Sequence, residues 1–429
     1  MPVAKYMSIR MLLAILAGRK AKIYQMDVNT AFLYNSIDET VYVEQPEGFK
    51  VPGKEDYICL LRKALYCLKQ SPRAWFHVIA EVLADFDFKQ STSDPCIWIH
   101  QAGNGERTYI ALYVDDLIIA VENDGTIATI KQRLSQRFEM KDLGIARKFL
   151  GIEIEYGHDG SIKIHQNQYI QQLLERHGMG DCNLVTMEMD TSVKLTSITK
   201  NEASTDPPEY ASIVRGLTFV AYVIRPDIAC VVGQLSQFLN NPSTTHMHAA
   251  KGILRYLQGT STLGITYRPP PLRLQGYSDA NWGGDMDTRR STTGYVVMLN
   301  NGAIAWKSRR QPTVALSTME LEYMALTDAT KELIWIKMLL ADLGYANHNS
   351  KKPTELFSDN QGAIALANNP VSHSRAKHVA IKHHCVREVI QDHLIWVQYI
   401  PTAEMTADSL TKALGREKHE KCTIRMGMS

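Results

Sequence analysis

Two short apolar runs stand on either side of one acidic tetrapeptide. The runs cover residues 109–112 and 117–121, and the tetrapeptide at 113–116 has the sequence YVDD. Their length and composition predict two strands with a tight turn at or beside the paired aspartates. Adjacent carboxylates in that position can bind a divalent metal ion, although aspartate is also a favoured turn residue for structural reasons alone. A further carboxylate upstream in a similar context, Asp27, favours the metal interpretation.

A second acidic set follows in the last third of the chain. The pattern there predicts strands over 272–278, 294–299 and 303–306, a helix over about 318–343, a strand over 355–357 and a helix over 361–368. Asp279 ends the first of these strands, and Asp359 lies between the last strand and the last helix. This order of elements with carboxylates at these places resembles ribonuclease H.

The long helix of that segment offers two glutamates. At 100° per residue, Glu322 shares a face with a series of apolar positions, namely Ala325, Leu326, Ala329, Leu333, Ile336 and Leu340. A carboxylate on such a face is costly unless it is paired or bound to metal. Glu320 projects to the opposite side with Thr327 and Lys331, where a solvated charge is cheap. We therefore expect Glu322, rather than Glu320, to be a metal ligand.

The middle of the chain carries helical patterns but no candidate chemistry. A helix-like stretch over 168–175 is followed by a polar segment over about 187–208, which predicts a linker closed by two prolines. Apolar residues then recur at helical spacing over 210–267, and three prolines at 269–271 precede the last domain.

Composition is that of an ordinary globular protein. The chain has 429 residues, 45% hydrophobic and 21% charged, with a formal net charge of +2, so a nucleic acid would be held by local basic patches. Seven cysteines form no CxxC pair, which indicates reduced thiols and neither a disulfide framework nor a zinc ribbon. The apolar run at 11–17 is too short for a membrane span, and it lacks a signal-peptide cleavage pattern.

Ordered motifs along the chain resemble one family, the Ty1/copia-type (Pseudoviridae) LTR retrotransposons. The motifs QMDVNTAFLYNSIDETVYVEQPEGF, LRKALYCLKQSPRAWF, YVDD and FEMKDLGIARKFLGIEI are similar to its reverse transcriptase. The motifs YSDANWGGDMDTRRSTTGY, WKSRRQPTVALSTMELEYMAL, LFSDNQGAIALANNP and ADSLTKAL are similar to its RNase H domain. The resemblance implies a multidomain protein of the α+β / α/β class. A partial palm-fingers-thumb polymerase domain would cover 1–185, a linker and helical connection 186–270, an RNase H-like domain 271–415 and a C-terminal tail 416–429.

The resemblance also implies which carboxylates do the chemistry. In the polymerase, Asp27, Asp115 and Asp116 would hold two Mg²⁺ ions, with Mn²⁺ as an alternative. In the nuclease, the metal ligands would be Asp279, Glu322, Asp359 and Asp408. Two alternatives stay open: Ser-Asp-Asn before a helix is typical of an N-cap at Asp359, and Asp408 has the pattern of an ordinary exposed helix residue.

Other residues would handle the substrate. Phe32 stands where reverse transcriptases carry an aromatic residue that rejects a 2′-hydroxyl, and a core aromatic is the alternative. Lys69, Gln70 and Arg73 lie in the family segment near the incoming nucleotide and template. A further basic group suits phosphate contacts to a hybrid duplex, although such runs are also typical of solvated loops; its members are Arg289, Arg290, Lys307, Arg309 and Arg310.

Some positions depart from the family pattern. Cys67 and Asp87 stand where the family usually has glycine, and Ala380 stands where an aspartate is usual. At Cys67 a side chain would intrude where the backbone should approach the nucleotide or template. Four histidines at 373, 378, 383 and 384 suggest zinc, but no cysteine lies at finger spacing, so we favour no zinc site.

We therefore expect an RNA-directed DNA polymerase with RNase H activity. Its partners would be an RNA or DNA template-primer, dNTPs, an RNA/DNA hybrid and the absent protease, integrase and capsid parts of a polyprotein, without a membrane; the resemblance also allows a dimer. The location would be the cytoplasm, in a virus-like particle, or the nucleus. Only 26 residues precede Asp27, so most of the fingers would be missing and the polymerase weak or inactive. The alternatives are a nuclease alone or a non-catalytic nucleic-acid-binding remnant of a decayed element.

Overall fold

The computed structural model describes residues 3–19, 21–37, 39–103, 105–121, 124–198, 202–269, 272–345, 352–368 and 380–429, without the side chains of 124 and 380–385. The chain forms two compact units, Met1–Ile9 with Lys20–Ala146 and Arg10–Arg19 with Arg147–Ser429. Helix α1 (Tyr6–Leu16) begins in the first unit and ends in the second. Both units mix helices and sheets, which confirms the expected α+β multidomain class.

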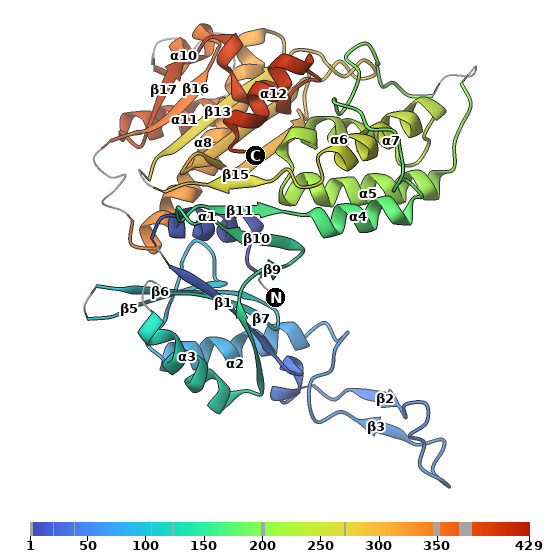
Figure 1. Cartoon of the computed structure of the whole chain (residues 1–429), viewed down its shortest axis with the longest axis vertical. Helices are drawn as coiled ribbons and strands as arrows, with labels where there is room; N and C mark the ends of the chain where they lie inside the picture. Colours follow the sequence, from blue (N-terminus) through green and yellow to red (C-terminus); the bar gives the residue numbers. More distant parts are fainter. Residues whose placement is uncertain are drawn as a thin grey trace. The chain divides into compact units, whose positions relative to one another are not determined.

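An antiparallel six-stranded sheet forms the centre of the first unit, in the order β4-β5-β6-β7-β1-β8. In chain order its strands are β1 (Lys22–Val28), β4 (Lys89–Gln90), β5 (Ile97–Gln101), β6 (Arg107–Tyr113), β7 (Asp116–Val121) and β8 (Met140–Ile145). Strands β6 and β7 confirm the two strands expected around the YVDD turn. Their apolar residues are buried, and helices α2 (Ser71–Asp85) and α3 (Asp124–Arg137) lie on one face of the sheet (Figure 1).

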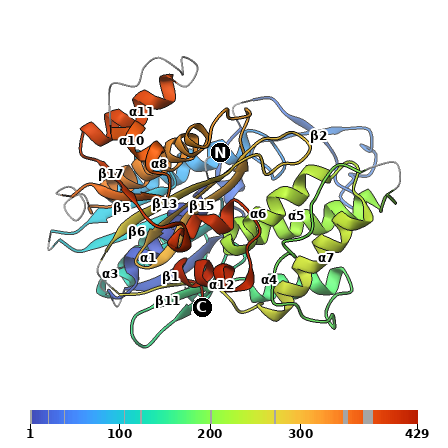
Figure 2. The same ribbon diagram turned by 90° about the horizontal axis from the view of Figure 1, so that it is seen from above.

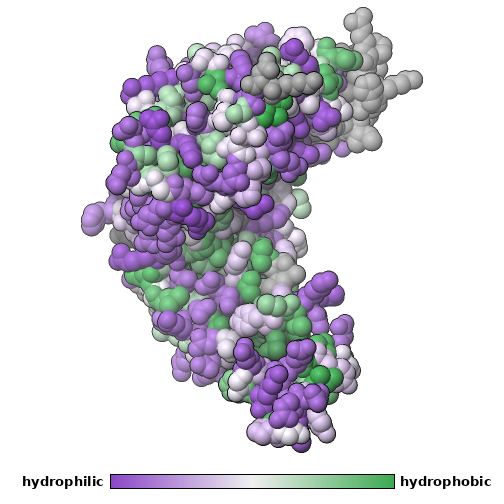
Figure 3. Space-filling model, turned by 90° about the vertical axis from the view of Figure 1, so that its right-hand side faces the viewer, coloured by the Kyte–Doolittle hydropathy of each residue, from purple (hydrophilic) through white to green (hydrophobic). Residues whose placement is uncertain are grey.

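A separate two-stranded sheet projects from the first unit. It consists of β2 (Tyr42–Glu44) and β3 (Ile58–Leu60), and its side chains Tyr42, Ile58 and Leu60 are each more than half exposed. Hydrophobic residues accordingly lie among hydrophilic ones at the lower end of Figure 3. An isolated pair of strands gains little stability from its own burial.

The second unit opens with a small antiparallel sheet in the order β12-β11-β10-β9. Its strands are β9 (Lys148–Phe149), β10 (Ile152–Tyr156), β11 (Ile162–His165) and β12 (Ile265–Tyr267). Four helices share one apolar core beside it: α4 (Asn167–Arg176), α5 (Pro207–Val223), α6 (Ala229–Leu235) and α7 (Thr244–Gly259). Figure 2 shows α5, α6 and α7 side by side. Residues 147–185, which were expected in the polymerase domain, belong to the same compact unit as these helices. Within that unit, β11 pairs with β12, which follows the helices in the chain.

The rest of the second unit is built on a five-stranded sheet in the order β15-β14-β13-β16-β17. Strands β13 (Leu274–Asn281), β14 (Thr292–Leu299) and β15 (Gly302–Arg310) are antiparallel, whereas β16 (Thr354–Ser358) and β17 (Ile395–Tyr399) run parallel to β13. The long helix α8 (Thr318–Asp342) packs on the sheet, with α10 (Gln361–Asn368) and α11 (Ala380–Gln391) beside it (Figure 2). The strands and helices expected in this segment are therefore confirmed.

Two segments differ from the sequence-based expectation. The prolines that were expected to close a linker instead begin α5, because Pro207 occupies its first position and the Asp206 side chain caps it. Residues 416–429, expected as a tail, form helix α12 (Arg416–Arg425) with a buried side. Its His419 pairs with Glu188 at 2.6 Å, and both side chains are buried. Among the described residues, no helix has the length and apolar composition needed to cross a membrane.

Candidate active sites

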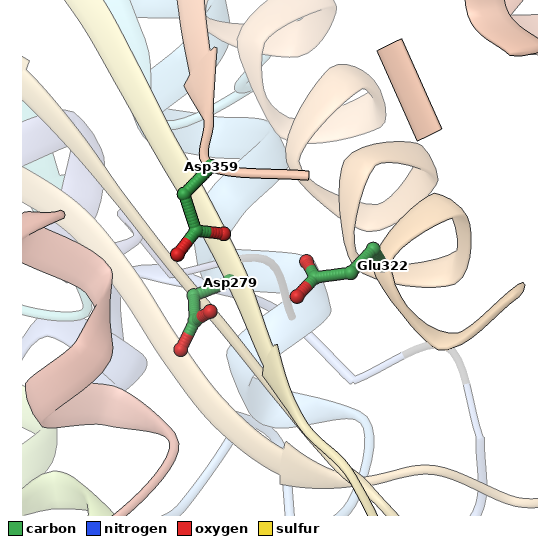
Figure 4. Close-up of side chains that lie close together, drawn as sticks. All are labelled: Asp279, Glu322 and Asp359. Carbon is green, nitrogen blue, oxygen red and sulfur yellow. The ribbon is translucent and has the colours of Figure 1, made fainter. Parts of the chain in front are cut away.

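Three carboxylates of the second unit lie together. Asp279 comes from β13, Glu322 from α8 and Asp359 from the loop after β16, and one carboxylate oxygen of each lies within 4.8 Å of the others. Figure 4 shows the three side chains pointing toward one another. Oε2 of Glu322 is buried and has no hydrogen-bond partner among the described residues. Because a buried carboxylate oxygen without a partner is costly, and because Mg²⁺ prefers oxygen ligands, this group fits a divalent cation.

Asp359 is not the residue that caps helix α10. The Asn360 side chain accepts the hydrogen bond from the backbone N–H of Ala363 at 2.9 Å, so it satisfies the end of the helix. The Asp359 carboxylate instead accepts a hydrogen bond from the Thr402 hydroxyl at 2.6 Å. The alternative of a structural cap therefore applies to the neighbouring asparagine, and the carboxylate stays directed toward Asp279 and Glu322.

The two glutamates of α8 have different surroundings. Glu320 accepts a hydrogen bond from the backbone N–H of Leu316 at 2.8 Å, and its own N–H donates to the Ser317 hydroxyl at 3.2 Å. It therefore stabilises the first turn of the helix, whereas Glu322 lies with Asp279 and Asp359. The expectation of a solvated opposite side was wrong for Thr327, which is buried.

Burial of this part of α8 on a second side has a simple cause. Tyr323 forms an apolar cluster with Ala367 of α10 and Val386 of α11, so other helices cover that side. The sequence of α8 alone could not reveal these neighbours, because Ala367 and Val386 lie 44 and 63 residues after Tyr323 in the chain.

The close approach of the acids shifts their ionisation. Burial and then the charge of Asp408 raise the pKa of Asp279 to about 7. Burial, followed by the charges of Asp279 and Asp359, raises the pKa of Glu322 to about 9. Neighbouring buried carboxylates resist simultaneous ionisation, and a divalent cation would remove that resistance.

Asp408 lies beside this group but is engaged elsewhere. It belongs to the 3₁₀ turn η6 (Thr406–Leu410), is fully buried and forms an ion pair with Lys412 at 2.7 Å and a second one with Lys418. Burial opposes its ionisation, but hydrogen bonds with Asp279 and the two lysines outweigh burial and lower its pKa. The alternative of an ordinary exposed helix residue therefore does not apply to Asp408. The structure brings Asp408 next to Asp279 but not into the 4.8 Å group.

The three carboxylates of the first unit also come from neighbouring strands. Strands β1 and β7 pair so that Asp27 lies directly opposite Asp116, and Asp115 lies in the turn before β7. Burial and the charge of Asp115 raise the pKa of Asp27, whereas the charge of Lys141 works against that rise. Burial also raises the pKa of Asp116, despite a hydrogen bond from the Gln25 amide at 3.2 Å.

This arrangement is more open than the nuclease-like one. Among the described residues, the Asp279 group is the single set of three or more potential ligands whose atoms all lie within 4.8 Å. Asp27, Asp115 and Asp116 are each half-buried, so they border solvent. They fit the binding of a cation that also contacts a solvent-accessible substrate.

Comparison with known proteins identifies the family. Residues 1–191 match the sequence model of the family described as "Reverse transcriptase (RNA-dependent DNA polymerase)". The chain is 38% identical over 433 residues to the retrovirus-related Pol polyprotein from transposon TNT 1-94 of Nicotiana tabacum. It is 34% identical over 310 residues to the transposon Ty5-1 protein of Saccharomyces cerevisiae, with 72% of this chain and 100% of that protein covered. The chain belongs to the Ty1/copia-type family of retrotransposon Pol proteins.

The match covers only part of the tobacco polyprotein. It covers 100% of this copia-type Pol chain but only 32% of that relative, so the chain spans about a third of the relative's length. Among solved structures, the foamy viral protease-reverse transcriptase in complex with an RNA/DNA hybrid is similar, with a TM-score of 0.48 and 14% identity. That likeness covers 91% of this chain and 45% of the viral one.

The expected nucleotide-binding residues of the copia-type Pol chain surround the first acidic set in part. Phe32 is buried in the turn η1 (Ala31–Tyr34), and its ring lies 4.5 Å from that of Tyr66. The Tyr66 pKa is raised, first by burial and then by the charges of Asp115 and Asp27, so this tyrosine borders the carboxylates. Tyr66 was not among the site residues predicted from the sequence. Lys69 and Gln70 directly precede α2 and Arg73 lies in its first turn, with Lys69 and Arg73 exposed.

The basic residues of the RNase H-like part divide into free and paired side chains. Lys307 lies 3.8 Å from Asp328, and Arg310 forms an ion pair with Asp285 at 2.6 Å. Their charges are thus partly matched within the protein. The side chains of Arg289, Arg290 and Arg309 form no ion pair with the described residues.

Both departures from the family's glycines coincide with unusual backbone conformations. Cys67 has φ = 74° and Asp87 has φ = 64°, which is the left-handed region that glycine adopts without strain. The chain therefore keeps the glycine-type backbone at both places while carrying a side chain. The four histidines for which no zinc site is expected, His373, His378, His383 and His384, and the departure at Ala380 lie outside the described side chains.

Proposed function

We propose that this chain is the reverse transcriptase–RNase H part of a retrotransposon polyprotein. It would synthesise DNA from dNTPs on an RNA or DNA template-primer and cleave the RNA strand of an RNA/DNA hybrid. The observation that carries this proposal is the group formed by Asp279, Glu322 and Asp359, with an unpartnered buried oxygen on Glu322. Carboxylates that resist joint ionisation suit the binding of a divalent cation. Without a cation, their burial and mutual repulsion lower the stability of the fold.

In the nuclease, Asp279, Glu322 and Asp359 would hold Mg²⁺, or Mn²⁺, with Asp408 as an additional ligand. The bound ions supply charge that activates a water molecule and stabilises the departing oxygen. The water oxygen adds to phosphorus, the bond from phosphorus to the 3′-oxygen breaks, and a 3′-hydroxyl and a 5′-phosphate result. Thr402 and Thr411 support this step by orienting the carboxylates, since their hydroxyls donate to Asp359 and to Asp279 at 2.6 and 2.5 Å.

In the polymerase, Asp27, Asp115 and Asp116 would hold the ions in the same way. The primer 3′-oxygen forms a bond to the α-phosphorus of the dNTP, and the bond from that phosphorus to the pyrophosphate breaks. The acids keep their orientation through the backbone of β1 and β7 and through the Gln25 amide.

The two units would contact different parts of the substrate. Phe32, with Tyr66 against its ring, would border the sugar of the dNTP, and Lys69, Gln70 and Arg73 would contact the dNTP or the template. The hybrid's phosphates would be contacted by the basic group of the second unit, namely Arg289, Arg290, Lys307, Arg309 and Arg310. We further propose that the chain acts in the cytoplasm within a virus-like particle, together with the other parts of the polyprotein, and that it can form a dimer.

One observation favours a nuclease alone as the second candidate. The acids of the second unit form a tight group, whereas those of the first unit do not meet the same 4.8 Å criterion. In that case the first unit would act only as a platform for the duplex.

A single reaction separates these functions. An RNA template annealed to a DNA primer, with different labels on the two strands, is incubated with the chain, dNTPs and Mg²⁺. We expect RNA cleavage that is lost in Asp279→Asn and primer extension that is lost in Asp115→Asn. Glu320→Gln is the matched control, because this acid stabilises a helix end and should leave both signals in place. Cleavage without extension would support the nuclease alone, and folded protein with neither signal would refute the enzymatic proposal.

A further inference from the structure

The turn that carries the polymerase acids has an unfavourable backbone. Val114 has φ = 58°, and a β-branched residue in the left-handed region is an outlier. Such a conformation persists only where the surrounding structure holds it in place. Two consecutive carbonyl oxygens of the turn accept hydrogen bonds. That of Val114 accepts one from the Trp75 indole N–H at 2.6 Å, and that of Asp115 accepts one from the backbone N–H of Val28 at 2.9 Å.

The indole is itself fixed by aromatic neighbours. Trp75 is fully buried in α2, and its ring packs edge to face against Phe138, with 5.1 Å between centroids. Tyr34 completes the cluster at 6.1 Å from Trp75 and 5.2 Å from Phe138, and its hydroxyl accepts a hydrogen bond from the N–H of Glu139. Phe138 and Tyr34 thus pack against the ring while its N–H donates to the carbonyl oxygen of Val114.

Phe32 and the acids are tied to the same cluster through the chain. Tyr34 follows Phe32 by two residues in η1, and Val28 follows Asp27 directly in β1. The cluster thus connects the segment of Asp27 with the turn of Asp115 and Asp116. Asp27 and Asp116 face each other across paired strands, so a displaced turn would move one acid relative to the other.

From this geometry we propose that Trp75 is a positioning residue of the polymerase site. Its indole N–H holds the Val114 carbonyl, keeps the strained turn in one conformation and thereby presents Asp115 and Asp116 opposite Asp27 for metal binding. The inference rests on the proposed polymerase function, but the effect of the Trp75 N–H on the conformation of the turn does not depend on catalysis. Phenylalanine at this position would keep an aromatic ring, leave the carbonyl without this partner and also leave part of the space of the indole empty, a loss that a second buried tryptophan changed in the same way would share.

The test compares two buried tryptophans of the first unit. Trp75→Phe removes the N–H and keeps an aromatic ring. Trp98→Phe is the matched control, because Trp98 is also buried, in β5, and its N–H has no hydrogen-bond partner among the described residues. Both changes are made in the full chain carrying Asp279→Asn, so that the nuclease group does not dominate metal binding. Hydrogen exchange of the peptide covering 113–117 and Mn²⁺ affinity by EPR are measured.

We expect Trp75→Phe to accelerate exchange at 113–117 and to weaken Mn²⁺ binding by about 2- to 10-fold, the range of one hydrogen bond. Trp98→Phe should change neither. Unchanged turn exchange in a folded Trp75→Phe protein, or equal effects in the control, would overturn the inference. If Mn²⁺ binding does not respond to Asp115→Asn while Trp75→Phe still loosens the turn, the polymerase proposal fails and the structural role of Trp75 stands.

Discussion

Gly294 lies directly opposite Asp279 in the pairing of β14 with β13. A Cβ atom at Gly294 would lie 2.6 Å from Cγ2 of Thr411 and 2.9 Å from Cβ of Leu410. These neighbours belong to the segment that carries Asp408 and donates the Thr411 hydrogen bond to Asp279. The missing side chain therefore allows the segment of Asp408 to approach the strand pair that carries Asp279.

Gly294→Ala should displace this segment. A Cβ closer than 3 Å to packed atoms forces a shift, and overpacking typically costs about 1–3 kcal/mol of stability. We expect the free energy of unfolding of the second unit to fall by that amount, and RNA cleavage to fall with it as the Thr411 hydrogen bond lengthens. The control is Gly252→Ala in α7, where a Cβ meets nothing within 4 Å and alanine favours the helix. Equal melting behaviour of the two variants would contradict the close-approach argument.

The raised pKa of Glu322 predicts how stability depends on pH in the absence of metal. Its pKa is about 9 in the folded chain against 4.5 for the free group, so folding takes up a proton between these values. Stability in EDTA should therefore fall as pH rises from 5 to 9, by at most about 1.4 kcal/mol per pH unit from this residue. Glu322→Gln should remove much of the slope and be more stable than the parent at pH 8. Urea unfolding at several pH values measures this.

Glu320→Gln provides the matched control for the pH experiment. This residue accepts a hydrogen bond at the start of α8, so its replacement should lower stability by about 0.5–1 kcal/mol through the weakened helix end. The slope with pH above 5 should stay that of the parent. If Glu320→Gln flattened the slope and Glu322→Gln did not, the assignment of the two glutamates would be reversed.

Divalent metal should reverse the repulsion among the same carboxylates. We expect Mg²⁺ to raise the stability of the second unit, by about 2.7 kcal/mol at a concentration of 100 times the dissociation constant. Calorimetry with Mg²⁺ and with EDTA measures the shift. Asp279→Asn should abolish it, whereas Asp115→Asn, in the first unit, should retain it. A shift that persists in Asp279→Asn would show that the ion binds elsewhere.

Cys67→Gly should stabilise the first unit. A non-glycine residue at φ = 74° carries a strain of about 1–2 kcal/mol, and the gain from relieving it is reduced by about 0.5–1 kcal/mol for the greater freedom of glycine when unfolded. We expect a net gain of about 0.5–1 kcal/mol, measured by thermal unfolding. Cys67→Ala is the control, because it removes the thiol and keeps the strained backbone. A gain in the alanine variant as well would assign the effect to the thiol.

Much of the nuclease-like part was determined by the sequence by itself. The period of apolar residues in α8 singled out Glu322, because a carboxylate on an apolar helix face needs a partner and the period can be counted along one segment. The two short apolar runs on either side of the YVDD turn likewise predicted β6 and β7. Segments with a strong local pattern behave in this way, since their own residues settle which side is buried.

Contacts between distant segments were decided only by the tertiary structure. The sequence could not show that Asn360 caps α10 in place of Asp359, because both residues are good caps and backbone geometry chooses between them. It could not show that Asp408 pairs with Lys412 and Lys418, because only the packed structure buries this carboxylate in the turn η6 with both lysines beside it. It could not show that the segment after residue 415 packs as a helix, because Glu188, the partner of His419, lies far away in the chain. The role of Trp75 depends on the direction of one N–H toward Val114, 39 residues later. Local periodicity records which side of an element is buried, whereas hydrogen-bond partners are fixed only when the elements pack.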